Sequence, residues 1–483
     1  MPMIDGLKPY PAYKDSGVPW LGEVPEHWEI ERLKSSVVNV IEQTAERENG
    51  DLYVALEHVE SWTGRLWSAG LDVTFDSQVK RFCPGDVLFG KLRPYLAKVT
   101  RPACDGVCVG EFFVLRSRSS SLFGRYLEYL LRSKPVIDAI NSSTFGAKMP
   151  RADWQFVGNL RLSFPPLPEQ TAIVRFLDHA DRRIRRYIRA KQKLIKLLEE
   201  QKQAIIHRAV TRGLDPNVRL KPSGVEWLGD VPEHWKVMPL RRLTVSRCDG
   251  PFGSGLKTSH YADQGIRVVR LQNIGHAEFK DSDVAFIPLS YYATLGDHTV
   301  EPGDLLIAGL GDERHPAGRA CVAPSFIVPA MVKADCFRFR LFRQRLDPEF
   351  AALHLTATAA DASSLLSTGA TRQRTNLQAT ASRSVAIPPT QEQLAIVKHI
   401  TDETSSLGRA IRDADREIAL LREYCTRLIA DVVTGKLDVR EVGARLPDEA
   451  DEPETRQDTD TVTEGDNDTD EGDLDDAPEE AEA

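Results

Sequence analysis

VPWLGEVPEHW at residues 18–28 and VEWLGDVPEHW at residues 225–235 are two copies of one segment, 207 positions apart. Two further pairs recur in the same order at an offset of 223: PPLPEQTAIV (165–174) with PPTQEQLAIV (388–397), and TRGLD (211–215) with TGKLD (434–438). A period of this length is far longer than the roughly 20–50 residues of solenoid repeats. The sequence therefore predicts two copies of a large unit, each made of a domain followed by a helix.

Each copy ends in a long segment with the apolar spacing of a coiled coil. In the second copy the apolar positions are Ile400, Leu407, Ile411, Ala414, Ile418, Leu421, Cys425, Leu428 and Val432. The equivalent positions of the first copy are Leu177, Ile184, Ile188, Lys191, Ile195, Leu198, Lys202, Ile205 and Ala209, of which seven are apolar. Neither helix can bury its stripe alone, so we expect the two to pair in antiparallel orientation. Packing of each helix on its own domain is the alternative.

The ends of both helices carry recognisable signals. Thr390 with Gln393 predicts a capping box, and Pro168 stands at the expected first helical position of the other helix. Gly213 and Gly435 fall near the two C-terminal ends, where a left-handed residue is favoured.

The stretches between these landmarks predict two mixed α/β domains. Strands are expected in YVALEHV (53–59), DVLFGKL (86–92), VCVGEFFVLRS (107–117) and NLRLSF (159–164), and a helix in LFGRYLEYLLRS (122–133). The corresponding segments of the second half are IRVVRLQNI (266–274), DLLIAGL (304–310), DCFRFRLF (335–342) and LDPEFAALHLTA (346–357). The sequences of the two halves diverge strongly between these segments, which favours one fold that recognises two different targets. A ligand with two similar halves suits such a chain, and duplex DNA is the commonest such ligand.

Composition excludes several classes of protein. A chain of 483 residues is expected to hold two or three domains. The sequence has no apolar run of about 18 residues and no signal-like start, so a cytoplasmic protein without a membrane span is expected. Cys104 and Cys108 are the only close cysteine pair and lack a second pair at zinc-ligand spacing, so no metal site is expected.

Charge is divided unevenly along the chain. Residues 447–483 hold 18 acidic residues and a single basic residue, Arg456. The rest of the chain holds 61 Lys and Arg and 53 Asp and Glu. The C-terminal stretch is therefore expected to be a disordered acidic tail. Solubility is its simplest role, and competition with DNA for the basic body is the alternative.

The paired WLGEVPEHW and WLGDVPEHW segments, the PPLPEQ and PPTQEQ helix starts, and the helices ending in TRGLD and TGKLD resemble the specificity subunit of type I restriction–modification systems. GDVLFGKLRPYLAKV (85–99) and GPFGSGLKTSHY with IRVVRLQNIG (250–275) look like the target-recognition domains of that family. The resemblance covers residues 8–440. It implies the following division: target-recognition domain 1 (8–166), a central coiled-coil helix (167–215), target-recognition domain 2 (219–388), a distal coiled-coil helix (389–440) and the tail (447–483).

The resemblance also implies a fold and a function. The fold is α/β (mixed α+β), with the two recognition domains separated by two long antiparallel coiled-coil helices in an internal pseudo-twofold repeat. The function is binding of a gapped, bipartite site on double-stranded DNA, one half-site per domain, with the coiled coil setting the gap. Two methyltransferase subunits and two restriction subunits would join the chain, which itself carries no chemistry and needs no cofactor.

The residues support a chain without a catalytic centre. The Pro-Pro pairs lie in FPPL and IPPT, which lack the flanks of an adenine methyltransferase motif. In GPFGSGLKT, Leu256 displaces Lys257 by one position from a phosphate-binding loop. A stand-alone nuclease or methyltransferase with an unrecognised active site stays the alternative, and a scaffold that binds only proteins is a third possibility.

Candidate DNA contacts are chosen by base-reading chemistry. Arg and Lys bind guanine O6 and N7, Asn and Gln bind adenine N6 and N7, and phosphates accept from all of them. In loops and strand ends of the two halves these are Lys91, Arg93, Lys148, Arg151, Lys257, Arg270, Gln272, Asn273, Arg372, Gln373 and Arg374. GATRQRTN is the counterpart of GAKMPR at the 223 offset, so matched positions carry different polar side chains, as two distinct half-sites require.

Residues shared by both repeats are candidates for contact with protein partners. They are Trp20, Trp28, Trp227, Trp235, Glu169, Gln170, Glu392 and Gln393. For the tryptophans and the neighbouring histidines, packing against a domain core is the interpretation that we favour, with a surface gripped by a methyltransferase as the alternative.

Overall fold

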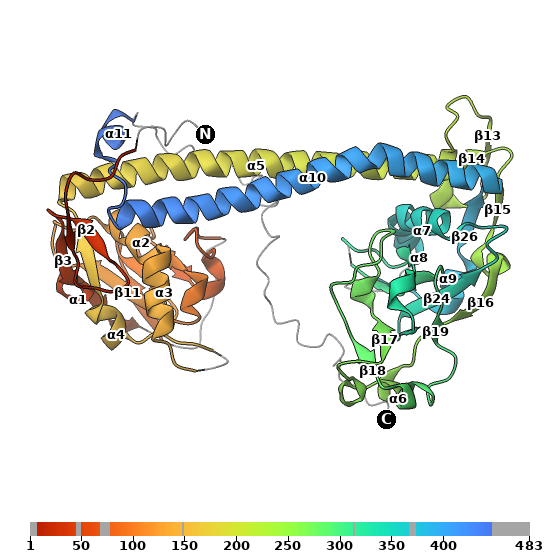
Figure 1. Ribbon diagram of the computed structural model, residues 1–483, viewed down its shortest axis with the longest axis horizontal. Helices are drawn as coiled ribbons and strands as arrows, with labels where there is room; N and C mark the ends of the chain where they lie inside the picture. Colours follow the sequence, from red (N-terminus) through yellow and green to blue (C-terminus); the bar gives the residue numbers. More distant parts are fainter. Residues whose placement is uncertain are drawn as a thin grey trace. The chain divides into compact units, whose positions relative to one another are not determined.

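The computed structural model describes residues 7–44, 50–67, 78–146, 149–312, 314–366 and 373–446. It divides into two compact units: unit 1 comprises Met1–Lys193 with Ala414–Ala483, and unit 2 comprises Leu194–Asp413. Each unit contains one α/β domain and part of each of two long helices, α5 (Leu167–Arg212) and α10 (Thr390–Val433) (Figure 1). The predicted α/β class, with two domains joined by long helices, is confirmed.

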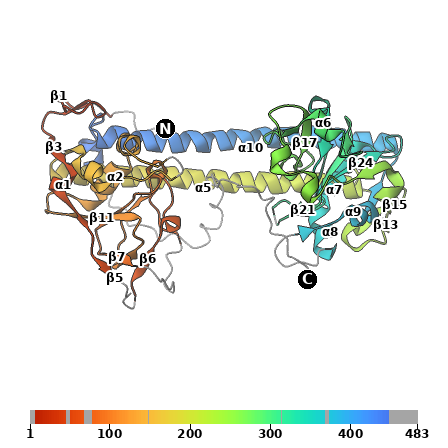
Figure 2. The same ribbon diagram turned by 90° about the horizontal axis from the view of Figure 1, so that it is seen from below.

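The first domain contains two four-stranded sheets. One has the order β4-β11-β8-β9 and the other β5-β7-β10-β6. Their strands are β4 (Val37–Val40), β5 (Gln43–Thr44), β6 (Leu52–Val54), β7 (Val79–Phe82), β8 (Val87–Gly90), β9 (Val99–Thr100), β10 (Gly106–Cys108) and β11 (Phe112–Ser117). In Figure 2, β5, β6 and β7 lie at the end of this domain away from α5, and β11 lies closer to it.

Short elements complete the first domain and join it to α5. The paired strands are β1 (Tyr13–Asp15) with β2 (Glu23–Pro25), and β3 (Glu29–Arg32) with β12 (Arg161–Phe164). The helices are α1 (Leu33–Ser36), α2 (Gly124–Arg132), α3 (Lys134–Ser142) and α4 (Trp154–Asn159), and α11 (Arg440–Arg445) follows α10 in the same unit.

The second domain also contains two four-stranded sheets, with the orders β16-β24-β20-β22 and β18-β17-β23-β19. Their strands are β16 (Thr244–Cys248), β17 (Ile266–Val269), β18 (Phe286–Ile287), β19 (Thr299–Val300), β20 (Leu305–Ala308), β22 (Ala320–Val322), β23 (Ala330–Val332) and β24 (Cys336–Leu341). Three short pairs are β13 (Leu220–Pro222) with β14 (Asp230–Pro232), β15 (Lys236–Pro239) with β26 (Ser384–Ile387), and β21 (Leu310–Gly311) with β25 (Gln373–Arg374). The helices are α6 (Leu289–Tyr292), α7 (Pro348–Ala357), α8 (Ala359–Leu366) and α9 (Leu377–Ser382).

The two domains share not only strand order but also pairing register. Phe112 of β11 pairs with Gly90 of β8, and at the same places in the second domain Cys336 of β24 pairs with Ala308 of β20. The parallel pair β10–β6 matches β23–β17 in the same way. A slip of one residue would turn every side chain to the opposite face. Matching registers therefore show that the repeat extends through the diverged interiors. The exception is one edge strand: β5 pairs with β7 in the first domain, whereas β18 pairs with β17, the counterpart of β6, in the second.

The predicted coiled-coil positions are all buried or half-buried in both long helices. Within unit 1, Lys191 of α5 pairs with Glu417 of α10 at 2.7 Å. Leu177 and Leu428 share one apolar core there, whereas Ile206 and Ile400 share the core of unit 2. The beginning of each helix thus packs with the end of the other, as the antiparallel prediction requires.

Local signals at the helix ends gave mixed results. Gly213 and Gly435 have φ of +73° and +78°, so the left-handed ends are confirmed. The capping box is wrong: the Thr390 hydroxyl donates to the Gln344 carbonyl, and the Gln393 side chain binds residues outside the helix.

Several expected strands are shorter or divided. IRVVRLQNI forms a strand only to Val269 and then a 3-10 turn. YVALEHV forms a strand only to Val54 and then a 3-10 turn, and VCVGEFFVLRS is split into β10 and β11. The acidic tail lies outside the described residues. In the described part of the chain, no helix is long and apolar enough to cross a membrane.

Candidate nucleic-acid interface

The first WLGEVPEHW segment is fixed to the start of α5 by a buried carboxylate. Trp28 is fully buried, and its indole Nε1 donates to Glu169 Oε1 at 2.9 Å. His27 Nε2 lies 2.8 Å from the other oxygen of Glu169. Gly435, just past the end of α10, lies against the Trp28 ring, where a Cβ atom would collide with Pro25.

Unit 2 repeats this arrangement with its own residues. The Trp235 indole donates to Glu392 Oε1 at 3.0 Å, and His234 Nε2 lies 2.8 Å from Glu392 Oε2. Gly213, just past the end of α5, lies against Trp235 and Glu392. In each unit, therefore, the repeated segment joins the start of one long helix to the end of the other.

The glutamines that follow these glutamates are also structural. Gln170 accepts from the Phe123 N–H at 2.8 Å, and Gln393 accepts from the Asp347 N–H at 2.7 Å. Each amide nitrogen donates to two backbone carbonyls. Trp28, Trp235 and both glutamines are thus used inside the protein, whereas Trp20 and Trp227 are half-buried. Contact of this set with partner subunits stays a prediction.

Three predicted DNA contacts of the first domain are brought together by backbone hydrogen bonds. The Ala152 N–H donates to the Lys91 carbonyl, and the Arg93 N–H to the Pro150 carbonyl, both at 2.8 Å. The Lys91 N–H donates to the carbonyl of Glu111 at 2.9 Å. The loop after β8, the turn before β11 and the segment before α4 thus meet. We call Lys91, Glu111 and Arg151 the first-domain junction.

An ion pair closes this junction. Arg151 Nη2 lies 2.9 Å from Glu111 Oε1, and the two side chains are 45% and 32% exposed. The backbone of Arg151 is therefore fixed while its guanidinium is accessible, and contact with the edge of a nucleobase or with a phosphate requires both.

The second domain contains the same junction at equivalent positions. The Thr375 N–H donates to the Gly309 carbonyl at 2.8 Å, and the Gly309 N–H donates to the Asp335 carbonyl at 2.7 Å. Arg374 Nη2 lies 3.4 Å from Asp335, and the Arg374 side chain is 63% exposed. We call Gly309, Asp335 and Arg374 the second-domain junction. Arg374 is the structural counterpart of Arg151.

The other predicted contacts are scattered or occupied. Lys148 and Arg372 lie outside the described residues. Gln373 accepts from the Ala317 N–H at 3.2 Å and so braces a neighbouring loop. Lys257 and Gln272 are exposed on turns next to the sheet that contains β17, and not on the β21–β25 pair.

Asn273 and Arg270 have structural contacts in the second domain. Asn273 is fully buried, accepts from the Arg270 N–H and donates to the carbonyls of Lys280 and Asp283. The Arg270 guanidinium pairs with Asp283. His58 accepts from the Ala55 N–H at the equivalent turn of the first domain. This position therefore holds a turn in both domains, and the Asn273 amide is not available to a base in this structure.

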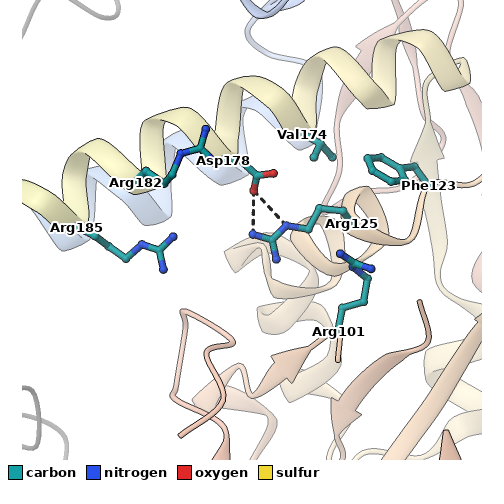
Figure 3. Close-up of a pocket in the computed structure, with 7 residues that line it drawn as sticks. All are labelled: Arg101, Phe123, Arg125, Val174, Asp178, Arg182 and Arg185. Carbon is teal, nitrogen blue, oxygen red and sulfur yellow. Dashed lines mark hydrogen bonds and ion pairs between the residues drawn. The ribbon is translucent and has the colours of Figure 1, made fainter. Parts of the chain in front are cut away.

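Sequence reasoning missed a cluster of arginines in unit 1. A cavity of about 260 Å³ is lined by Arg101, Phe123, Arg125, Val174, Asp178, Arg182 and Arg185 (Figure 3). Arg125 donates twice to Asp178, at 2.9 and 3.1 Å. Four guanidinium groups and one carboxylate line this cavity, and Arg125 and Arg185 also pair with Glu128 and Asp181 outside the lining. Guanidinium groups are the side chains that bind phosphate in a bidentate manner. The run RRIRR at 182–186 was the available signal.

No family model matches the chain. It is 25% identical over 216 residues to the type I restriction enzyme MjaVIII specificity subunit of Methanocaldococcus jannaschii, covering 42% of this chain and 48% of the relative. The chain thus spans about half the length of this relative. It is 23% identical over 448 residues to the putative type I restriction enzyme MjaX specificity subunit of the same organism, covering 87% of this chain and 96% of the relative.

A solved structure agrees in fold. One chain of a structure described as showing complex assembly and conformational transition of the type I restriction–modification system aligns with a TM-score of 0.61. The identity is 19%, and the alignment covers 85% of this chain and 98% of the other. In sequence the chain is similar to specificity subunits of type I restriction enzymes, and in fold it is similar to one chain of a type I restriction–modification system.

Proposed function

We propose that the chain is the DNA sequence-specificity subunit of a type I restriction–modification complex. It binds a gapped, bipartite site on double-stranded DNA, with one half-site for each of its two domains. It directs two methyltransferase and two restriction subunits to that site and carries no catalytic centre of its own. Such a complex acts on cellular DNA in the cytoplasm.

One observation supports this proposal most strongly. The two domains share the order and register of their first sheet and the junction itself, yet the side chains at matched positions around the junctions differ. Lys91 of the first domain corresponds to Gly309 of the second, and Arg93 corresponds to Gly311, because both pairs follow register-matched strands at the same distance. A duplicated fold with different side chains at one matched site suits two different half-sites.

Charge supports DNA as the ligand. Outside residues 447–483, Lys and Arg exceed Asp and Glu by eight. An exposed arginine stands at each junction, and the arginine cavity of unit 1 offers a place for a phosphate. Cationic side chains provide most of the affinity for the DNA backbone, while contacts at base edges give specificity.

Domain boundaries are part of the proposal. Residues 8–166 and 219–388 form the two target-recognition domains, and residues 167–215 and 389–440 contain the helices that connect them. The tail at 447–483 lies outside the recognition machinery.

The test is reconstitution of methyl transfer from purified parts. The methyltransferase subunits of the same system are expected to methylate DNA at one gapped motif only when this chain is present. The chain alone is expected neither to cut DNA nor to transfer methyl groups. Cutting or methylation by the chain alone would instead establish the stand-alone enzyme. Assembly with its partners without any sequence preference on DNA would establish the protein-only scaffold.

A further inference from the structure

We infer that Glu111 and Asp335 are positioning residues that aim Arg151 and Arg374 at a guanine, one in each half-site. This inference rests on the proposed function and deepens it, because it assigns a chemical task to one matched pair in each domain.

The two carboxylates occupy the same place in the fold. Glu111 immediately precedes β11, and Asp335 immediately precedes β24. Each backbone carbonyl accepts from the first residue after the neighbouring strand, Lys91 in one domain and Gly309 in the other. The backbone that carries each carboxylate is therefore fixed by the sheet.

The acid–arginine pair is retained while its surroundings change. At the junctions, Lys91 is replaced by Gly309, Pro150 by Gln373 and Ala152 by Thr375. The arginine is unchanged, and glutamate is replaced by aspartate, which keeps the charge. The two domains have thus diverged around a constant ion pair.

Stability does not account for this constancy. The two arginine side chains are 45% and 63% exposed. Ion pairs exposed to this extent contribute little to folding, because water screens the attraction and both side chains lose rotamer freedom. A role in orienting the guanidinium is consistent with the same geometry.

Orientation has a direct consequence for base reading. The guanidinium binds guanine O6 and N7 with two parallel N–H groups, so its plane must be fixed. The ion pair engages Nη2 in both domains, and no other side-chain contact of Arg151 or Arg374 is seen among the described residues. The remaining N–H groups of the two guanidinium groups make no hydrogen bond or ion pair with a described residue. A guanidinium ordered in advance loses less entropy on binding.

The backbone of Asp335 fits this assignment. Its φ is +60°, in the left-handed region that side-chain-bearing residues rarely adopt. Glycine would relieve that constraint but would remove the carboxylate, whereas aspartate tolerates the conformation and keeps it. Residues held in such conformations concentrate at functional sites.

The experiment uses the complex of the full chain with its methyltransferase subunits and a DNA library randomised across the methylated motif. The variants are Glu111→Gln and Asp335→Asn, with Glu111→Asp and Asp335→Glu as conservative rescues. Asp138→Asn is the matched control, because it removes an exposed ion pair with Lys134 that lies outside the junction.

Glu111→Gln is expected to relax discrimination at one G·C position of one half-site by roughly 5- to 100-fold, the range of a bidentate arginine–guanine contact. Asp335→Asn is expected to relax one G·C position of the other half-site only. Arg151→Lys and Arg374→Lys are expected to relax the same two positions. The conservative rescues and the control keep the wild-type motif.

Two results would overturn the inference. The first is an unchanged motif with Glu111→Gln and Asp335→Asn. The second is a uniform loss of methylation at every sequence, which would assign the arginines to phosphate contact or the acids to folding. Thermal unfolding of each variant separates loss of fold from loss of reading. Failure of the proposed function is a distinct outcome, since the wild-type complex would then select no gapped motif at all.

Discussion

The indole Nε1 of Trp28 donates a 2.9 Å hydrogen bond to Oε1 of Glu169, 141 residues later in the chain. The same carboxylate accepts from the Tyr10 hydroxyl at 2.6 Å, and burial together with Glu169 raises the pKa of that tyrosine. One side chain at the start of α5 therefore fixes the N-terminal segment of the first domain to the helix.

Removal of this carboxylate is expected to destabilise unit 1. Glu169→Ala leaves the buried Trp28 N–H and Tyr10 O–H without an acceptor, at an expected cost of about 2–4 kcal/mol in the free energy of unfolding. Glu169→Gln keeps one acceptor and is expected to cost less. Glu392→Ala is the matched variant in unit 2, where the carboxylate is more exposed, and a smaller loss is expected. Urea unfolding of the three variants measures these free energies, and Glu169→Ala is expected to lose the most. Equal losses in all three variants would contradict this ranking.

A buried histidine predicts a pH effect on unit 2. Burial, with a contribution from the charge of Arg383, lowers the pKa of His354 from 6.5 to about 3. Below pH 6.5 the unfolded chain takes up a proton that the folded chain refuses, so this group makes stability fall as the pH decreases towards 3. His354→Gln is expected to flatten that part of the profile. The difference between the wild-type and variant unfolding curves at pH 7 and pH 5 measures the effect, and parallel curves would argue against it.

The arginine cavity of unit 1 predicts a contact with the DNA backbone. Arg101→Ala and Arg185→Ala are expected to weaken binding of the assembled complex to specific and non-specific DNA alike. Each lost phosphate contact is expected to reduce the slope of log K against log salt by about 0.9. Fluorescence anisotropy at several salt concentrations gives both quantities, with Lys134→Ala as an exposed control. A change confined to one DNA sequence would instead indicate base reading.

The acidic tail predicts an electrostatic effect on non-specific binding. Deletion of residues 447–483 removes 18 acidic residues and one arginine, leaving a body with an excess of positive charge. Binding of the truncated chain to random DNA is expected to be tighter at low salt, and the difference is expected to vanish as salt screens it. Equal affinities at low salt would leave the tail with a role in solubility alone.

Sequence predicted the parts of this fold that depend on local spacing. The coiled-coil positions and the left-handed glycines at 213 and 435 follow from neighbours along one helix. The capping box failed because Gln393 is taken by Arg345 and Asp347, which only the tertiary fold brings to the helix start.

The candidate site also contains some residues that the repeat in the sequence predicts and others that only the tertiary fold brings together. The repeat offset was enough to match the segments that contain Arg151 and Arg374. It gave no indication of Glu111 and Asp335, because these acids lie about 40 residues away and meet the arginines only through the register of the sheet. Asn273 was expected from its side-chain chemistry, but the turn that it stabilises could be seen only in three dimensions.

The proposed function requires that this chain selects the DNA sequence on which its partner subunits act. A genome-wide map of N6-methyladenine, made in the host with and without the gene, tests it most directly. Deletion is expected to remove methylation from one gapped, two-part motif, and restoring the gene is expected to return it. A map that is unchanged by deletion in cells that express the whole system would rule out the proposed function.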